Sequence, residues 1–184
     1  MEHYLEIRVL PDPEFTSNLL INALFAKLHR ALVEDGTGEI GISFPLVGKC
    51  LGDIIRLHGD QTALQRLMAF GWLKGLTDYT NVTGVLPIPQ NCRYRVVRRL
   101  QAKSSAERLY RRSVRKGWLT TDEVGEKIKM VKEQHLKQPF VQLKSKSTGQ
   151  MFRLFIHHDK ILVEPTPGIF SHYGLSADAT IPWF

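Results

Sequence analysis

The fold is decided by residues 4–36, which read YLEIRVLPDPEFTSNLLINALFAKLHRALVEDG. Residues 4–10 alternate between apolar and polar side chains, which predicts a half-buried strand. Asp12 and Pro13 are typical of a helix start. Apolar residues then recur at helical spacing at Leu20, Leu24, Leu28 and Leu32. We therefore expect a strand followed by a helix that runs to about Val33 and ends at Gly36 and Gly38.

The following residues extend this pattern to six elements. Residues 39–46 and 54–58 resemble strands, Asp60 is placed to cap a helix that stops near Gly71, and a further strand is expected within 78–88. The order β-α-β-β-α-β is the ferredoxin-like pattern. Pro87 and Pro89 mark its end. The fold class is thus α+β, with a ferredoxin-like βαββαβ domain at residues 1–90.

Residues 91–184 predict a smaller α+β domain. A strand is expected at 92–102, and a helix at 104–116, with a capping box at Ser104 and Glu107 and a stop at Gly117. A second helix is expected from Thr120 to about Leu136. Residues 140–145 and 151–157 predict a hairpin around 147–150, and shorter strands are expected at 161–164 and 170–175.

Positive charge is concentrated in one segment. Ten Lys or Arg and one acid lie between Arg93 and Lys116, so the charge of this segment is +9. Since the net charge of the chain is +7, the remaining residues together carry −2. Such a patch favours a polyphosphate partner, because binding releases condensed counterions. On the predicted helix, the basic side chains lie on one face, at Arg108, Arg111, Arg112, Arg115 and Lys116.

Upstream of this helix, Arg99 and Gln101 lie two residues apart, on one face of the predicted strand. Arginine pairs with guanine edges and glutamine with adenine edges, so the pair is suited to base readout. The groove of a long RNA duplex is too deep and narrow for side chains. A short hairpin, whose groove opens at its ends, is therefore the expected ligand.

The sequence also narrows the class of protein. It has no run of about 18 apolar residues and no signal-peptide pattern, and its two cysteines, Cys50 and Cys92, are far apart. We expect a cytoplasmic protein without a membrane segment. His157, His158 and Asp159 suggest a metal site, but adjacent strand residues point to opposite faces. No metal or other cofactor is expected.

Several motifs follow one another along nearly the whole chain: HYLEIR at 3–8, KLH at 27–29, IGISFP at 40–45, RLQAKS at 99–104, SKSTGQMFRLFI at 145–156, YGLS at 173–176 and PWF at 182–184. In this order they resemble the repeat-processing endoribonucleases of type I-F CRISPR systems. The chain departs from that family at Lys116-Gly117, where the family continues with basic residues.

The resemblance implies an enzyme that binds the CRISPR repeat stem-loop and cleaves at its 3′ base without a metal. Attack by the 2′-hydroxyl would give a 2′,3′-cyclic phosphate, and the enzyme would stay bound to the mature guide RNA among other subunits of the type I-F surveillance complex. When free, it is expected to be a monomer.

The resemblance also implies the site residues. The catalytic ones are His29 for proton transfer, Ser145 and Tyr173. A lone helix histidine is more commonly structural, so the resemblance and not the periodicity assigns His29. Arg99 and Gln101 would read bases at the foot of the stem, Phe152 would stack on its terminal base pair, and Ser147 would contact the substrate. Arg111, Arg112 and Arg115 align with the groove-contacting arginines of the family, and the basic segment adds Lys103, Arg108 and Lys116 as further RNA-binding candidates.

Two other interpretations stay open. A non-catalytic RNA-binding subunit of a ribonucleoprotein complex would keep the fold and the basic patch but would not cut. A DNA-binding regulator is a weaker alternative, because no helix-turn-helix spacing accompanies the basic helix.

Overall fold

The computed structural model describes residues 1–101, 112–117, 137–145 and 147–184. Contacts divide the chain into two compact units: one contains residues 1–100 and 138–184, the other residues 101–137. Within the described residues, no helix has both the length and the apolar character that crossing a bilayer requires.

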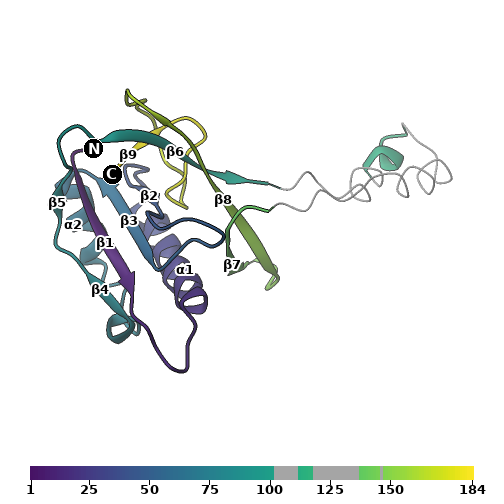
Figure 1. Ribbon diagram of the computed structural model, residues 1–184. Helices are drawn as coiled ribbons and strands as arrows, with labels where there is room; N and C mark the ends of the chain where they lie inside the picture. Colours follow the sequence, from purple (N-terminus) through teal and green to yellow (C-terminus); the bar gives the residue numbers. More distant parts are fainter. Residues whose placement is uncertain (102–111, 118–136, 146) are drawn as a thin grey trace. The chain divides into compact units, whose positions relative to one another are not determined.

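The first unit contains both helices and strands, which confirms the α+β class (Figure 1). In chain order its elements are β1 (His3–Val9), α1 (Ser17–Asp35), β2 (Gly41–Ser43), β3 (Ile54–Gly59), α2 (Gln61–Ala69), the 3-10 turn η1 (Thr77–Tyr79), β4 (Thr80–Val82), β5 (Leu86–Pro87), β6 (Arg93–Leu100), β7 (Phe140–Lys144), β8 (Met151–Leu162) and β9 (Thr180–Trp183).

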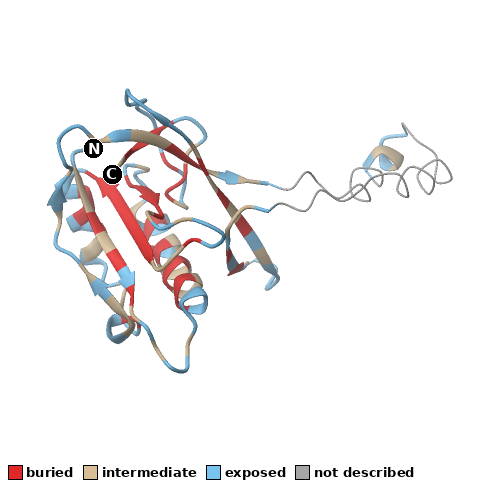
Figure 2. Ribbon diagram, in the orientation of Figure 1, coloured by how far each residue is buried: buried red, intermediate tan, exposed pale blue. Residues whose placement is uncertain are grey.

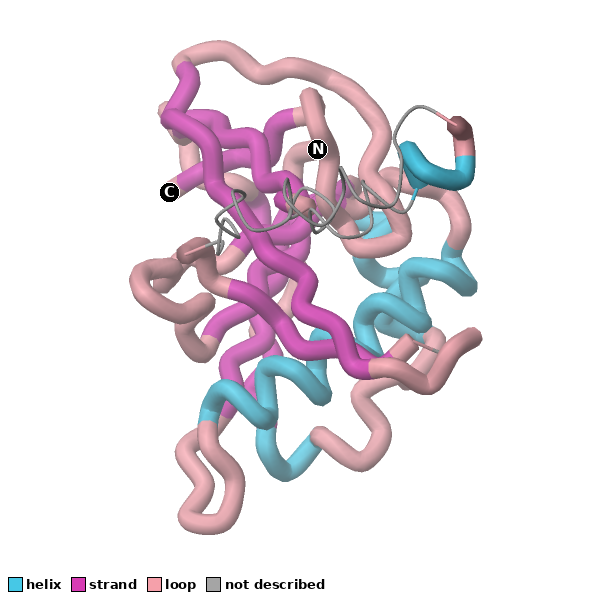
Figure 3. The backbone as a smooth tube through the Cα atoms, turned by 90° about the vertical axis from the view of Figure 1, so that its right-hand side faces the viewer, coloured by secondary structure: helices cyan, strands magenta, loops and turns pink. Residues whose placement is uncertain are grey.

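The first sheet has the strand order β2-β3-β1-β4, with β5 paired beside β4 on the same strand β1. Its pairs are antiparallel. The predicted element order β-α-β-β-α-β is therefore present, and the name ferredoxin-like stays a prediction. Strand β3 is buried along its whole length (Figure 2). In the side view of Figure 3, the helices of the unit lie beside its strands.

Helix α1 buries the apolar stripe that the spacing predicted, including Leu20, Leu24 and Leu28. Its start was predicted too early. The Asp12 carboxylate accepts hydrogen bonds from two backbone N–H groups, those of Glu14 and Phe15, which forms a turn before the helix. The helix begins at Ser17, where Thr16 caps it. It ends as predicted at Gly36, which has φ +67°.

The second sheet has the order β7-β8-β6-β9. The predicted hairpin is confirmed, since β7 pairs antiparallel with β8. The predicted strand at 170–175 is wrong, because those residues form turns and irregular structure. The Ser171 N–H donates to the Leu175 carbonyl, and the Gly174 N–H donates to the Ser171 carbonyl. Strand β9, which pairs with β6, was not predicted.

Both sheets contribute to one hydrophobic cluster. Leu5, Ile7 and Leu57 come from the first sheet, and Val97 and Ile156 from the second. All strands of the first sheet precede residue 90, and all strands of the second sheet follow it, so the division into sheets agrees with the expected boundary. The hydrophobic core does not divide there, because it contains residues from both sheets. Independent folding of residues 1–90 and 91–184 as two domains stays a prediction.

In the second unit, residues 112–115 form a helical turn that ends at Gly117. The Lys116 N–H donates to the Arg112 carbonyl at 3.1 Å, and Gly117 has φ +70°. This confirms the predicted helix stop. The beginning of that helix and the whole of the helix expected from Thr120 lie outside the described residues.

Candidate functional site

A pocket of about 560 Å³ lies in the first unit, between α1, the second sheet and the loop before β9. It brings together the three candidate catalytic residues, His29, Ser145 and Tyr173. Arg99 and Phe152, predicted from the sequence to bind RNA, also line it. The remaining lining residues are Ala26, Arg30, Val33, Leu143 and Lys144.

His29 is half-buried on α1, and its ring is oriented by a backbone group. Its Nδ1 lies 2.8 Å from the carbonyl oxygen of His172. A carbonyl oxygen only accepts hydrogen bonds, so Nδ1 must carry the hydrogen. In the neutral ring, Nε2 is then the nitrogen with a free lone pair. The fold therefore selects the tautomer in which Nε2 can accept a proton.

Tyr173 holds the same imidazole through its ring. The His29 and Tyr173 rings stack, with centroids 4.2 Å apart and planes 12° from parallel. Phe25 also lies nearly parallel to Tyr173, at 6.4 Å. Stacking restricts rotation of the His29 ring, while the hydrogen bond to His172 fixes which edge faces the loop.

Ser145 follows the end of β7 and begins the turn that leads to β8. Its backbone N–H donates to the Gln150 carbonyl at 2.9 Å, and its Oγ lies 3.1 Å from the Oγ of Ser147. The N–H of Gln142 on β7 donates to Oδ1 of Asn22 on α1 at 2.9 Å. This bond joins the strand that leads to Ser145 to the helix that bears His29.

The charge of the pocket is one-sided. Three of its ten lining residues are cations, Arg30, Arg99 and Lys144, and none is an acid. They come from three elements, α1, β6 and β7. The Arg99 guanidinium lies 5.8 Å from the centroid of the Tyr173 ring, within the range of a cation–π contact. The pocket is thus suited to an anion.

Phe152 combines the two roles that the sequence left open for it. It alternates along β8 with the buried Leu154 and Ile156 and packs against the hydrophobic core. It is nonetheless only half-buried and lines the pocket. Part of its ring is therefore available to a ligand.

The remaining RNA-binding candidates come from the turn after β7, from the second unit or from residues outside the described ranges. Ser147 lies in the turn beside Ser145. Gln101, Arg112, Arg115 and Lys116 belong to the second unit, and all four are exposed. Ser113 and Val114, on the other side of the helical turn, are half-buried, which agrees with the predicted basic face. Lys103, Arg108 and Arg111 lie outside the described residues.

Sequence reasoning missed Arg30, Lys144 and the His172 carbonyl. The position of Arg30 beside His29 and of Lys144 beside Ser145 could have suggested the first two. The carbonyl had no signal, because it is a backbone group 143 residues from its partner.

The two neighbouring histidines of the suspected metal motif, His157 and His158, differ in burial, as expected for adjacent residues on a strand. His158 is buried and accepts a hydrogen bond from the Phe44 N–H at 3.3 Å. His157 is half-exposed and lies 3.2 Å from the Asp159 carboxylate. Among the described residues, no group of three His, Cys, Asp or Glu is placed to hold a metal ion.

Fold and site together define an α+β protein whose histidine, serine and tyrosine meet in a cationic pocket, with a separate arginine-bearing helical turn. A family model described as "CRISPR-associated protein (Cas_Csy4)" matches residues 4–184. The chain belongs to this family, as its motifs had indicated.

Two relatives match over the full length of both chains. A protein of Escherichia coli (strain UTI89 / UPEC) named "CRISPR-associated endonuclease Cas6/Csy4" is 55% identical over 184 residues. A protein of the same name from Pseudomonas aeruginosa (strain UCBPP-PA14) is 44% identical over 187 residues.

Proposed function

We propose that this chain is a CRISPR RNA endoribonuclease that binds the repeat stem-loop and cuts at its 3′ base without a metal ion. The observation that carries the proposal is the His29–His172 hydrogen bond, which leaves Nε2 of His29 as an acceptor in a cationic pocket beside Ser145. The endonuclease names of the two full-length relatives support it.

In the proposed reaction, Nε2 of His29 takes the proton from a ribose 2′-hydroxyl. The 2′-oxygen forms a bond to the adjacent phosphorus as the bond from phosphorus to the 5′-oxygen of the next nucleotide breaks. The products are a 2′,3′-cyclic phosphate and a 5′-hydroxyl, whose oxygen takes its proton from water. The hydroxide that this leaves takes the proton held on Nε2 of His29, so the imidazole is neutral again.

The Ser145 hydroxyl holds the attacking 2′-hydroxyl by a hydrogen bond and restricts it to a geometry in line with the leaving oxygen. Tyr173 keeps the imidazole in plane through the observed stacking.

The parts of the RNA away from the cleaved bond are bound by the RNA-binding candidates named in the sequence analysis. Arg99 and Gln101 read bases at the foot of the stem, Phe152 stacks on the terminal base pair and Ser147 contacts the strand. Cations of the basic helix, including Arg112 and Arg115, bind the stem phosphates and groove edges.

This mode of binding implies that the cut stem-loop stays bound. The monomeric cytoplasmic enzyme would then pass with its guide RNA to the other subunits of a type I-F surveillance complex. Repeated turnover at sub-stoichiometric enzyme would contradict this part of the proposal.

The test is incubation of the pure protein with a labelled repeat hairpin in excess EDTA, followed by mapping of the product ends. We expect a single cut at the 3′ base of the stem and a cyclic phosphate end. A requirement for a divalent ion would overturn the metal-free mechanism. Tight binding without any cut would favour a non-catalytic RNA-binding subunit.

The residue assignment is tested with two histidine variants. His29→Ala should lower the single-turnover rate by at least about a hundredfold, because the proton acceptor is lost, with hairpin affinity nearly unchanged. His172→Ala is the control: its side chain is exposed, and the carbonyl that contacts His29 is retained. Loss of hairpin binding in His29→Ala would instead make His29 a structural residue.

A further inference from the structure

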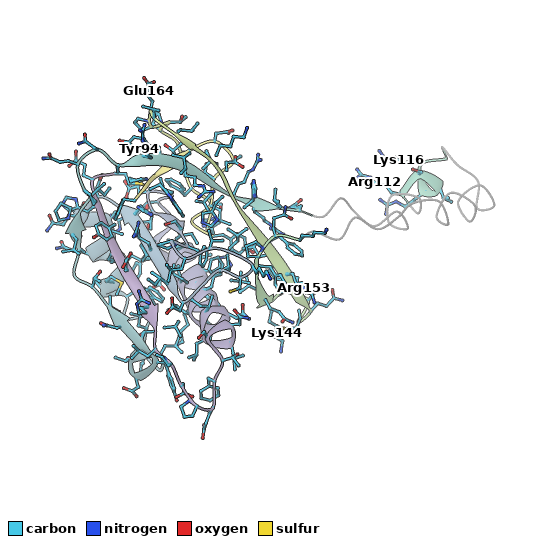
Figure 4. The ribbon with its side chains drawn as sticks, viewed as in Figure 1. Tyr94, Arg112, Lys116, Lys144, Arg153 and Glu164 are labelled. Carbon is cyan, nitrogen blue, oxygen red and sulfur yellow. The ribbon has the colours of Figure 1, made fainter. Side chains whose placement is uncertain are left out.

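Arg30 and Lys144 are pocket cations that the proposed mechanism does not assign. Arg30 is on α1, where Ala26, Arg30 and Val33 follow at helical spacing and line the pocket with His29. Lys144 is the last residue of β7 and directly precedes Ser145. Figure 4 shows Lys144 at the end of the β7–β8 hairpin. The two cations therefore flank the proposed catalytic residues from two elements.

Neither side chain is neutralised by another residue of the described ranges. Across the described residues, the Arg30 and Lys144 side chains have no ion-pair or hydrogen-bond partner. Glu34 lies one helical turn beyond Arg30, where a pair would be ordinary, yet none forms. Together with Arg99, these two residues place three positive charges around one pocket, which repel each other until an anion enters.

The anion that enters can be identified from the part of the RNA that would lie beside Arg30 and Lys144, an identification that rests on the proposed function. Arg99 and Phe152 are assigned to the foot of the stem, and His29 and Ser145 to the bond that is cut. Beyond a cut at the 3′ base of the stem, only the single-stranded 3′ flank continues. The phosphodiester groups of this flank are negatively charged and can therefore pair with Arg30 and Lys144.

We propose that Arg30 and Lys144 form a phosphate-binding subsite for the single-stranded RNA directly 3′ of the cleaved bond. The subsite holds the leaving strand, so the 5′-oxygen is aligned opposite the attacking 2′-oxygen. Arg30 is a bidentate donor to phosphate oxygens, and Lys144 contributes a point charge.

The test compares two RNAs. One is the repeat hairpin with a single-stranded 3′ extension, made uncleavable by a 2′-deoxy sugar before the cut. The other is the same hairpin ending at the base of the stem. Arg30→Gln and Lys144→Gln should each weaken binding of the extended RNA about tenfold, the effect of one lost charge-assisted contact, and leave the short RNA unchanged. The salt slope for the extended RNA should fall by about 0.7 for each lost contact.

Lys160→Gln is the matched control, because Lys160 is an exposed cation on β8 that does not line the pocket. It should bind both RNAs as the unaltered protein does. Equal weakening of both RNAs by Arg30→Gln and Lys144→Gln, or no weakening of either, would overturn the subsite.

Cleavage separates this subsite from the proposed function. If the unaltered protein cuts the extended hairpin in its all-ribose form, but the two variants bind the uncleavable extended hairpin normally, only the subsite fails. If the protein binds but never cuts, while both variants lose affinity for the extended RNA alone, the nuclease function fails and the subsite stands.

Discussion

At the scale of single residues, Gly174 controls where the His172 carbonyl meets His29. Gly174 has φ +67°, and a Cβ added to it would lie 2.5 Å from Cγ2 of Ile42. Its carbonyl accepts from the Ile42 N–H at 2.9 Å, which attaches the loop to the first sheet. A side chain here must either displace Ile42 or move the loop that bears His172 and Tyr173.

Gly174→Ala should therefore affect both stability and cleavage. The left-handed backbone costs an alanine about 1 kcal/mol, and the clash adds roughly 1–3 kcal/mol. Because the His172 carbonyl shifts, the single-turnover rate should fall roughly tenfold or more under conditions where the protein is still folded. Denaturant unfolding and cleavage of the hairpin measure the two effects.

Gly71→Ala is the control for the backbone cost alone. Gly71 has φ +61°, and a Cβ there would meet nothing within 4 Å. It should lose about 1 kcal/mol of stability and keep its cleavage rate. An equal loss of cleavage in both variants would mean that reduced stability, and not the His172 position, causes the effect.

The candidate site was predictable in part. His29, Ser145 and Tyr173 were found through motifs, and the structure places all three in one pocket. Spacing alone could not show this, because helix α1, the β7–β8 turn and the loop at 171–175 meet only in the folded chain. The hydrogen bond that orients His29 uses a backbone carbonyl, which no side-chain pattern encodes.

At the scale of elements, the helical turn at 112–115 presents Arg112 and Arg115 to solvent. Replacing either by glutamine should weaken hairpin binding roughly tenfold, because the proposed function gives each a charge-assisted contact to the stem. The slope of log affinity against log salt should become shallower by about 0.9 for a lost phosphate contact. Lys49→Gln, which removes an exposed cation of the other unit outside the basic 93–116 segment, is the control. An unchanged slope in Arg112→Gln and Arg115→Gln would contradict the phosphate contact.

Elements with one buried face were predictable, and the others were not. Helix α1 and the β7–β8 hairpin show the period of their structure, because each has one side in the core. Strand β9 contains Pro182, has no alternating pattern and is defined only by its pairing with β6. Residues 170–175 have the apolar content of a strand, but Ser171 and Gly174 turn the chain back on itself.

At the scale of the first unit, each of the two sheets contains a buried histidine. The Nε2 of His58 on β3 lies 2.8 Å from the Ser43 hydroxyl oxygen, and His158 on β8 accepts the Phe44 N–H. Burial, reinforced by the charge of Arg56, lowers the pKa of His58 to about 3. Burial, with Arg95 and His157 as further causes, lowers the pKa of His158 to about 4.

Because of these pKa shifts, the free energy of unfolding of the first unit should decrease at acid pH. A histidine whose folded pKa lies below its unfolded value of 6.5 favours folding only while it is neutral. Its stability contribution is complete above pH 6.5 and is lost as the pH falls from 6.5 toward 4. Each such histidine should remove about 1.4 kcal/mol per pH unit within this window.

The His158 contribution can be isolated by the slope of unfolding free energy against pH between 6.5 and 4.5. His158→Gln should be less stable than the unaltered protein at pH 7, since the ring leaves the core, but its slope should be smaller by about one proton. The comparison variant is His172→Gln, which removes an exposed histidine that is not among the causes of the His158 shift. Since carboxylates also titrate in acid, only the difference between the two variants is diagnostic. If both reduce the slope equally, the acid sensitivity does not arise from the buried His158 ring.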